Sequence, residues 1–112
     1  MAEKIKLFSV VWSERAVTDL LRILDYIALD SPVSAEKLYH TLKKQCQDLC
    51  YFPLQGRLIP ELKDLGISLY RELVVEVYRV IYRVDKKTLL ILTVLDSRRD
   101  LETLLFDCLM DR

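Results

Sequence analysis

The chain has 112 residues, of which 52% are hydrophobic and 30% charged, and its seventeen basic and seventeen acidic residues give a formal charge of zero. That length suits one compact domain and is too short for two ordinary ones. Because the protein has no net charge, its overall charge does not favour binding to nucleic acid. No apolar run approaches the roughly 20 residues that cross a bilayer, and the N-terminus does not resemble a signal peptide, so we expect a cytoplasmic protein without a membrane partner.

The first half of the chain predicts a strand followed by two helices. Residues 5–12 are rich in β-branched and aromatic side chains, as strands are, and Ser13 can cap a helix of about four turns that begins near Glu14. Ser31 and Pro32 then favour the start of a second helix, which ends before Pro53. Both helices have an apolar face, so we expect an α-hairpin in which the two apolar faces pack against each other. The faces consist of Ala16, Val17, Leu20, Leu21, Leu24, Ile27 and Ala28, and of Ala35, Leu38, Tyr39, Leu42, Cys46 and Leu49.

The second half predicts three strands and a last helix. After a loop at residues 53–66, strands are expected at 68–75, 77–84 and 88–95, and the short turn at 85–87 makes the last two antiparallel. The third strand is apolar on both faces except at Thr93, which is typical of a strand in the middle of a sheet. Alternation puts Leu95 on the face of Leu89 and Ile91, and Val94 on the other. Residues 100–110 repeat the helical apolar spacing.

This order of elements predicts an α+β fold with a single domain over residues 1–112. It consists of an N-terminal strand, an α-hairpin, a three-stranded antiparallel meander and a C-terminal helix, with the helices packed on a mostly antiparallel four-stranded sheet. The three cysteines, Cys46, Cys50 and Cys108, lack the spacing of a metal site. We therefore expect buried thiols, no metal and no cofactor.

Arginines in and after the predicted strands are the unusual feature of the chain. In strand 77–84 the tyrosines and valines point to one face, and Arg79, Ile81 and Arg83 point to the other. One face should therefore pack while the other offers guanidinium groups to a partner. The alternative is that arginines such as Arg71 and Arg83 pair with nearby acidic residues, Glu72 among them, as solvated charges on the sheet.

Several motifs in this order resemble the RelE/ParE family of toxins from bacterial type II toxin–antitoxin modules, over roughly residues 5–109. Besides the helical hairpin, they are Gly56-Arg57, Pro60-Glu61, Tyr70-Arg71-Glu72-Leu73, Tyr78-Arg79-Val80-Ile81-Tyr82-Arg83-Val84 and Arg98-Arg99-Asp100-Leu101. The resemblance implies a toxin that is neutralised by a cognate ParD-like or RelB-like antitoxin. ParE-like members, which include plasmid stabilisation proteins, bind DNA gyrase and trap its cleaved-DNA intermediate. RelE-like members cut messenger RNA inside the ribosome.

For a RelE-like nuclease, the resemblance implies catalytic roles for three residues. Arg79 would lie beneath the scissile phosphate, Arg98 would be a second cation, and Glu61 would be the base. The tyrosine or histidine that nuclease members carry near the C-terminus is replaced here by apolar and acidic residues at 101–105, and His40 lies in the second helix. We therefore favour the ParE-like interpretation, with a ribosome-dependent endonuclease, or a relative that only binds its antitoxin, as the alternatives.

A ParE-like toxin needs only a surface that binds gyrase, because gyrase itself breaks the DNA. We expect this surface to include Arg71, Arg83, Arg98 and Arg99, since arginine forms bidentate pairs with carboxylates and phosphates. For the antitoxin, we expect the aromatic residues left over after the hairpin packs to line an apolar groove for an extended arm or an amphipathic helix. These residues are Trp12, Tyr26 and Tyr51.

Overall fold

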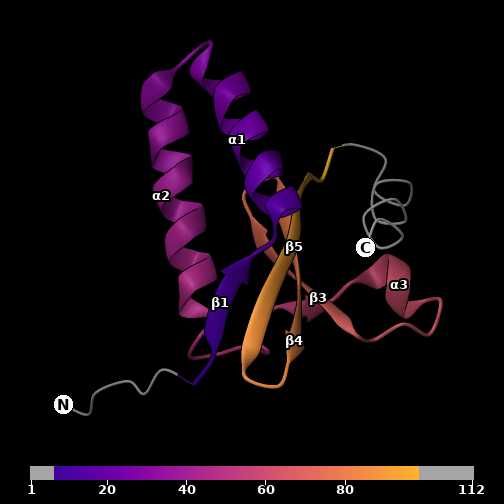
Figure 1. Ribbon diagram of the computed structural model, residues 1–112. Coiled ribbons are helices and arrows are strands. Elements are labelled where there is room, and N and C mark those ends of the chain that lie inside the picture. The colour runs from indigo at the N-terminus through magenta and orange to yellow at the C-terminus, as the bar shows by residue number, and fades with distance from the viewer. Residues whose placement is uncertain (1–6, 99–112) are drawn as a thin grey trace.

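The computed structural model describes residues 7–98 and contains an α-hairpin on one face of a five-stranded sheet (Figure 1). The strands are β1 (Ser9–Trp12), β2 (Arg57–Leu58), β3 (Tyr70–Val75), β4 (Tyr78–Asp85) and β5 (Thr88–Asp96). The helices are α1 (Glu14–Ala28), α2 (Pro32–Asp48) and α3 (Pro60–Lys63). The strand order is β1-β5-β4-β3-β2, with β1 parallel to β5 and all other neighbours antiparallel. The predicted α+β class is confirmed.

The sheet has one strand more than predicted, because the segment expected to be a loop contains β2 and the single turn of α3. The predicted position of the third strand is confirmed, since β5 lies between β1 and β4. The predicted C-terminal helix at residues 100–110 lies outside the described residues. Across residues 7–98 no helix has the length and apolar character needed to span a membrane.

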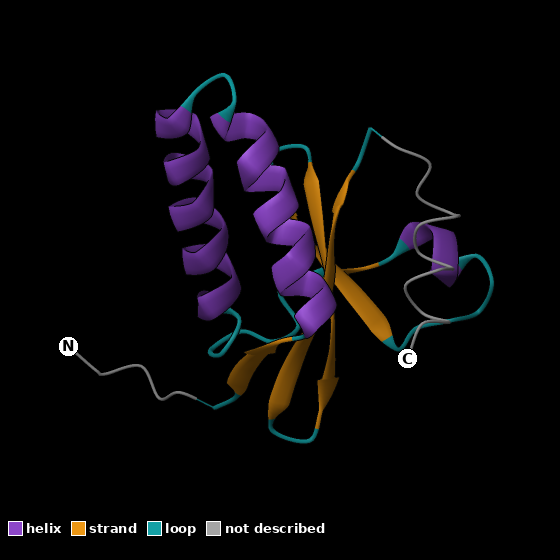
Figure 2. Ribbon diagram, turned by 45° about the horizontal axis from the view of Figure 1, so that its top comes forward, coloured by secondary structure: helices purple, strands orange, loops and turns teal. Residues whose placement is uncertain are grey.

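Both helices of the hairpin begin at the predicted serine caps. The Ser13 hydroxyl accepts a hydrogen bond from the Ala16 N–H at 3.0 Å, and the Ser31 hydroxyl accepts one from the Ser34 N–H at 3.1 Å. Pro32 occupies the first turn of α2, where its missing N–H costs no intrahelical hydrogen bond. The two helices lie on one side of the sheet and α3 lies on the other (Figure 2).

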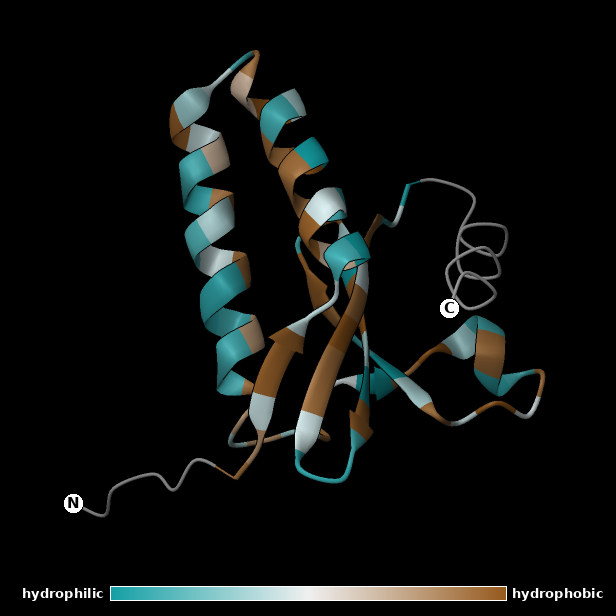
Figure 3. Cartoon of the chain, viewed as in Figure 1, coloured by the Kyte–Doolittle hydropathy of each residue, from teal (hydrophilic) through white to brown (hydrophobic). Residues whose placement is uncertain are grey.

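Apolar side chains fill both faces of the sheet. The helices turn their hydrophobic sides toward the strands (Figure 3), and the core between them includes Leu20, Leu42 and Tyr82. On the opposite face, a smaller cluster joins α3 to the sheet. Its buried members are Ile59, Leu62, Tyr70, Ile81 and Leu95. A charged residue on either face is therefore surrounded by apolar neighbours unless it reaches an edge.

A β-bulge corrects the predicted faces of the last strand. The pairing of β4 with β5 shifts between Ile81 and Tyr82, so that Leu92 is an extra residue in β5. Beyond the bulge, Val94 packs with the core on the hairpin side and Leu95 packs with the opposite cluster. The prediction for these two residues was wrong because one inserted residue exchanges the faces of all that follow.

Helix α1 binds the polar groups at this bulge. The Ser13 hydroxyl donates to the Leu92 carbonyl at 2.9 Å. The Asp19 carboxylate accepts from the Thr93 hydroxyl and from the Val94 N–H. The buried Thr93 hydroxyl therefore has a partner, and the bulge fixes where α1 lies on the sheet.

Candidate functional site

Four charged residues meet on the sheet face opposite the hairpin, and the strand register brings them together. Arg57 in β2 lies directly across from Glu72 in β3. Glu72 lies across from Ile81 in β4, and Arg79 is two residues before Ile81, so its side chain lies on the same face. Helix α3 follows β2 closely in the chain and carries Glu61. We call these four residues the Arg57–Glu61–Glu72–Arg79 cluster.

The two arginines share one buried carboxylate. The Nε of Arg57 donates to one oxygen of Glu72 at 2.6 Å, and the Nε of Arg79 donates to the other oxygen. The Nη1 and Nη2 groups of Arg79 each donate to one oxygen of Glu61 at 2.8 Å. The side chain of Glu72 is 0% exposed, that of Arg79 is 6% exposed and that of Glu61 is 26% exposed. Removing one member of such a buried pair leaves an uncompensated charge, which is strongly destabilising.

The electrostatics of the cluster keep Glu61 and Arg79 charged. Hydrogen bonds from Arg79 hold the pKa of Glu61 below its ordinary value of 4.5, against the opposing effect of burial. Hydrogen bonds to Glu61 raise the pKa of Arg79 above its ordinary value. A general base works best with a pKa near the operating pH and a free oxygen. Glu61 has neither, because its pKa is lowered and both of its oxygens accept hydrogen bonds from Arg79.

The expectation that this strand offers guanidinium groups to a partner is wrong for Arg79. The structure shows it enclosed, with its Nε, Nη1 and Nη2 groups all bonded within the chain. Sequence analysis considered Glu72 as a partner for neighbouring arginines, but the register assigns it to Arg79 and Arg57. Arg57 is therefore a member of the site that sequence analysis did not single out.

Arg71, one of the predicted target-binding residues, holds the loop that leads to Arg57. Its Nη1 group donates to the Gly56 carbonyl at 2.8 Å. The Tyr82 hydroxyl accepts from the Gly56 N–H at 3.0 Å and donates to the Pro53 carbonyl at 2.8 Å. A Cβ atom at Gly56 would lie 2.5 Å from the Tyr82 hydroxyl oxygen, so only glycine fits this close approach.

The other predicted arginines lie apart from the cluster. Arg83 is half-buried on β4, and its Nε has no hydrogen-bond partner among residues 7–98. Arg98 follows β5 and forms a bidentate pair with Asp96, with distances of 2.9 Å and 2.6 Å, while its side chain is 66% exposed. Hydrogen bonds to Asp96 raise the pKa of Arg98. Arg99 lies outside the described residues.

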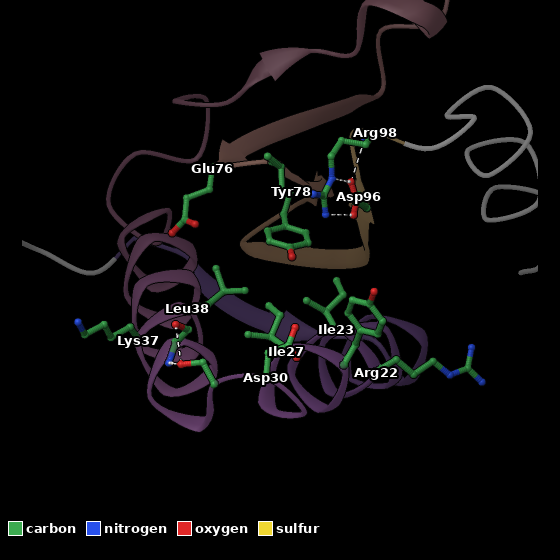
Figure 4. Close-up of a pocket in the computed structure, with 14 residues that line it drawn as sticks. Arg22, Ile23, Ile27, Asp30, Lys37, Leu38, Glu76, Tyr78, Asp96 and Arg98 are labelled. Carbon is green, nitrogen blue, oxygen red and sulfur yellow. Dashed lines mark hydrogen bonds and ion pairs between the residues drawn. The ribbon is translucent and has the colours of Figure 1, made fainter.

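A groove of about 990 Å³ lies between the tip of the hairpin and the ends of β4 and β5 (Figure 4). Its floor is apolar and includes Ile27 and Leu38 from the two helices. The Tyr78 side chain points from β4 toward the helices, and burial, with Asp96 nearby, raises the pKa of its hydroxyl. Charged residues of both signs line the groove, among them Arg98. Arg98 therefore lies on the hairpin side, whereas Arg79 and Glu61 lie on the opposite face, so the three predicted catalytic residues do not form one site.

The predicted antitoxin-binding residues are spread along the hairpin. Tyr26 lines the groove and is 76% exposed. Trp12 packs against the hairpin core near the start of α1, with the Lys43 Nζ 4.9 Å from its ring centroid. Tyr51 follows the end of α2. Because α1 and α2 are antiparallel, Tyr26 and Tyr51 lie at opposite ends of the hairpin, and the three aromatic residues do not line one groove.

Cys46 and Cys50 are free, buried thiols, as predicted, and Cys108 lies outside the described residues. Burial raises the pKa of Cys46 to about 12, so this thiol stays protonated and unreactive. Within the described part of the chain, no group of three or more histidine, cysteine, aspartate or glutamate side chains is arranged to hold a metal ion.

Comparison with known proteins identifies the family. Residues 10–101 match the family model described as the ParE toxin of the type II toxin–antitoxin system parDE, and the chain belongs to this family. The predicted membership of the RelE/ParE toxins is thus confirmed. The chain is also 43% identical over 49 residues to Toxin RelE2 of Caulobacter vibrioides. That match covers 44% of this chain and 56% of the relative, little more than half of its length.

Two solved structures have similar folds. A chain of the chromosomal ParDE toxin–antitoxin system from P. aeruginosa matches with a TM-score of 0.66 and 26% identity, over 82% of this chain and 98% of that one. A chain of the toxin–antitoxin complex RelBE2 from Mycobacterium tuberculosis matches with a TM-score of 0.57 and 22% identity, over 85% and 97% of the two chains. At 22% identity, the match to the RelBE2 chain shows only that the two folds are similar.

Replacing Glu61 by glutamine should lower stability at neutral pH and much less in acid. The folded pKa of Glu61 lies below its ordinary value of 4.5, so its charged form contributes stability above that value and loses it as the pH falls through the folded pKa. Urea unfolding followed by circular dichroism should therefore give a lower midpoint for Glu61→Gln than for wild type at about pH 7, and the difference between the two midpoints should shrink steadily as the pH is lowered below 4.5. Glu36→Gln is the control, because Glu36 is 74% exposed and forms a long, exposed pair with His40 at 3.8 Å. Equal midpoints for Glu61→Gln and wild type at neutral pH would contradict the assigned role of Glu61.

Proposed function

We propose that this chain is the toxin of a type II toxin–antitoxin module and that it acts by binding DNA gyrase and trapping the cleaved-DNA intermediate. Membership of the ParE toxin family supports the role of toxin. The Arg57–Glu61–Glu72–Arg79 cluster supports gyrase over the ribosome as the target, because within residues 7–98 the candidate cation and the candidate base for RNA cleavage are bonded to each other.

The burial of Arg79 is the observation that carries this choice. Metal-free cleavage of RNA needs a cation at the phosphate, a base for the 2′-hydroxyl and an acid for the leaving oxygen. Arg79, the proposed cation, is 6% exposed at its side chain, and Glu61, the proposed base, is its hydrogen-bond partner. A phosphate can reach the Nη groups of Arg79 only by displacing Glu61, and this displacement removes the base.

A gyrase-binding toxin requires no reactive group of its own. It needs only to bind the cleaved state of gyrase more tightly than the uncleaved state, which shifts the population of gyrase toward that state. We retain Arg98 and Arg99, together with Arg71 and Arg83, as proposed target contacts. Arg98 suits this role, because an exposed pair such as Arg98 with Asp96 is weak and can exchange partners.

The groove beside Tyr26 is the proposed docking site for a cognate ParD-like or RelB-like antitoxin. Its apolar floor and charged rim suit an amphipathic segment of a partner protein. Trp12 and Tyr51 lie away from the groove, and we retain them as proposed contacts for an extended arm of the antitoxin. The similar solved structures come from toxin–antitoxin systems, which supports a partner of this kind.

Expression of the chain from a tightly controlled promoter tests the proposed function. We expect growth arrest, a DNA-damage response and gyrase covalently trapped on DNA, all suppressed by co-expression of the antitoxin. Rapid loss of translation with cut transcripts would instead identify a ribosome-dependent endonuclease. Unaffected growth in the presence of folded protein would identify a relative that only binds its antitoxin.

Replacing Tyr26 by alanine should weaken antitoxin binding about tenfold or more, because a large aromatic side chain at the groove is the kind of residue that dominates an interface. Titration calorimetry with the cognate antitoxin measures the dissociation constant. Tyr39→Ala is the matched control, since Tyr39 is also an exposed helical tyrosine but contacts its neighbour His40 edge to face and does not line the groove. Equal affinities for the two variants would contradict the proposed docking site.

A further inference from the structure

Arg57 differs from the other arginine of its cluster in that it faces solvent. Its side chain is 61% exposed, while its Nε is bonded to the buried Glu72. Among residues 7–98 no acceptor binds the Nη1 and Nη2 groups of Arg57. One edge of this guanidinium is therefore anchored in the protein, and the other edge, with two parallel donors, is open.

The surroundings of Arg57 fix its position before any partner binds. Its backbone pairs with β3 at Glu72, and the preceding residue, Gly56, has both its N–H and its carbonyl bonded, to Tyr82 and Arg71. The second oxygen of Glu72 is held by Arg79, so the carboxylate that anchors Arg57 cannot rotate freely. Binding through such a pre-positioned side chain loses less conformational entropy than binding through a free arginine.

The neighbours of Arg57 favour a protein partner over a nucleic acid. Val74 is two residues from Glu72 in β3, so it lies on the same face, and it is 48% exposed. Glu61 lies near enough that Arg57 contributes to lowering its pKa, and it is itself partly exposed. An exposed apolar side chain suits a protein surface. Glu61 is paired with Arg79, so its repulsion of a single carboxylate is small, whereas a chain of phosphates brings several negative charges to the same place.

We propose that Arg57 binds a carboxylate of the target protein through its Nη1 and Nη2 groups, with Glu72 as the residue that positions it. Paired N–H groups in one plane match the two oxygens of a carboxylate, and such bidentate charged pairs are stronger and more directional than single contacts. The proposal rests on the proposed function, because the target is gyrase, and it adds a contact on the sheet face opposite the hairpin groove. Arg57 lies on β2, one of the two edge strands of the sheet, where a large partner can approach it.

The test uses the full chain with purified DNA gyrase in two measurements. The first is the affinity of the chain for gyrase without DNA, and the second is the concentration of the chain that produces half-maximal trapped cleavage of a supercoiled plasmid. The variants are Arg57→Ala and Arg57→Lys, because lysine keeps the charge but loses the planar pair of donors. Lys87→Ala is the control, since it removes one exposed positive charge from the turn between β4 and β5. Thermal unfolding confirms that each variant is folded.

We expect both Arg57 variants to bind gyrase and to trap it about tenfold or more weakly than wild type, and Lys87→Ala to match wild type. Wild-type behaviour of both Arg57 variants would overturn the inference while leaving the proposed function intact. Wild-type behaviour of Arg57→Lys alone would overturn the role of the paired donors. A loss seen only when DNA is present would overturn the choice of a protein carboxylate. A wild-type chain that traps no gyrase would reject the proposed function, and this inference with it.

Discussion

The buried carboxylate of Glu72 is the interaction on which this face of the molecule depends. It joins three neighbouring strands, because it lies on β3 and binds Arg57 from β2 and Arg79 from β4. Arg79 in turn binds Glu61, and this ion pair attaches the single turn of α3 to the sheet. The four charges sum to zero, so a face that also buries Ile81 and Leu95 can hold them. A shift of register in β2 or β3 would separate these charges inside an apolar layer, and the cluster therefore specifies the pairing of the strands.

The same interaction is the basis of our proposal that the chain acts on gyrase and not on the ribosome. An arginine that stabilises a phosphorane must be open to the phosphate, and a base must be free to take a proton. Here the corresponding arginine and glutamate neutralise each other, and within the cluster the accessible guanidinium is that of Arg57 on the edge strand β2. The cluster therefore has a structural role, in which Glu72 and Arg79 hold Arg57 in place. This supports the proposed mode of action, in which the toxin binds its target and carries out no chemistry.

The regular elements could be predicted because local signals specify them. Apolar periodicity and the capping serines Ser13 and Ser31 gave the hairpin, and β-branched runs between turns gave the three long strands. The resemblance to RelE/ParE toxins followed from the order of short motifs and was confirmed by the family match. Two elements could not be found in this way. Strand β2 has two residues, too few for any period, and α3 is a single turn.

The candidate site was predicted less well because it depends on register. Arg79 was singled out from its place in a strand, but its partners are seven and eighteen residues away in the chain. A signal for the first partner existed. The two-residue turn at Glu76 and Val77 puts Val74 opposite Arg79, and Glu72 is the next residue on that face. The resemblance had named Glu61 as a base, but no comparable signal predicted that Glu61 and Arg57 would pair with Arg79 and Glu72, since their places follow from β2 and α3.

The coupling free energy between Arg79 and Glu72 tests this account most directly. It is obtained from urea unfolding of wild type, Arg79→Met, Glu72→Leu and the double variant. A buried, shared ion pair predicts that either single change is strongly destabilising and that the double variant recovers a coupling of about 2–3 kcal/mol. A coupling below about 0.5 kcal/mol would show that the two side chains act independently, and would contradict the structural role given to Arg79.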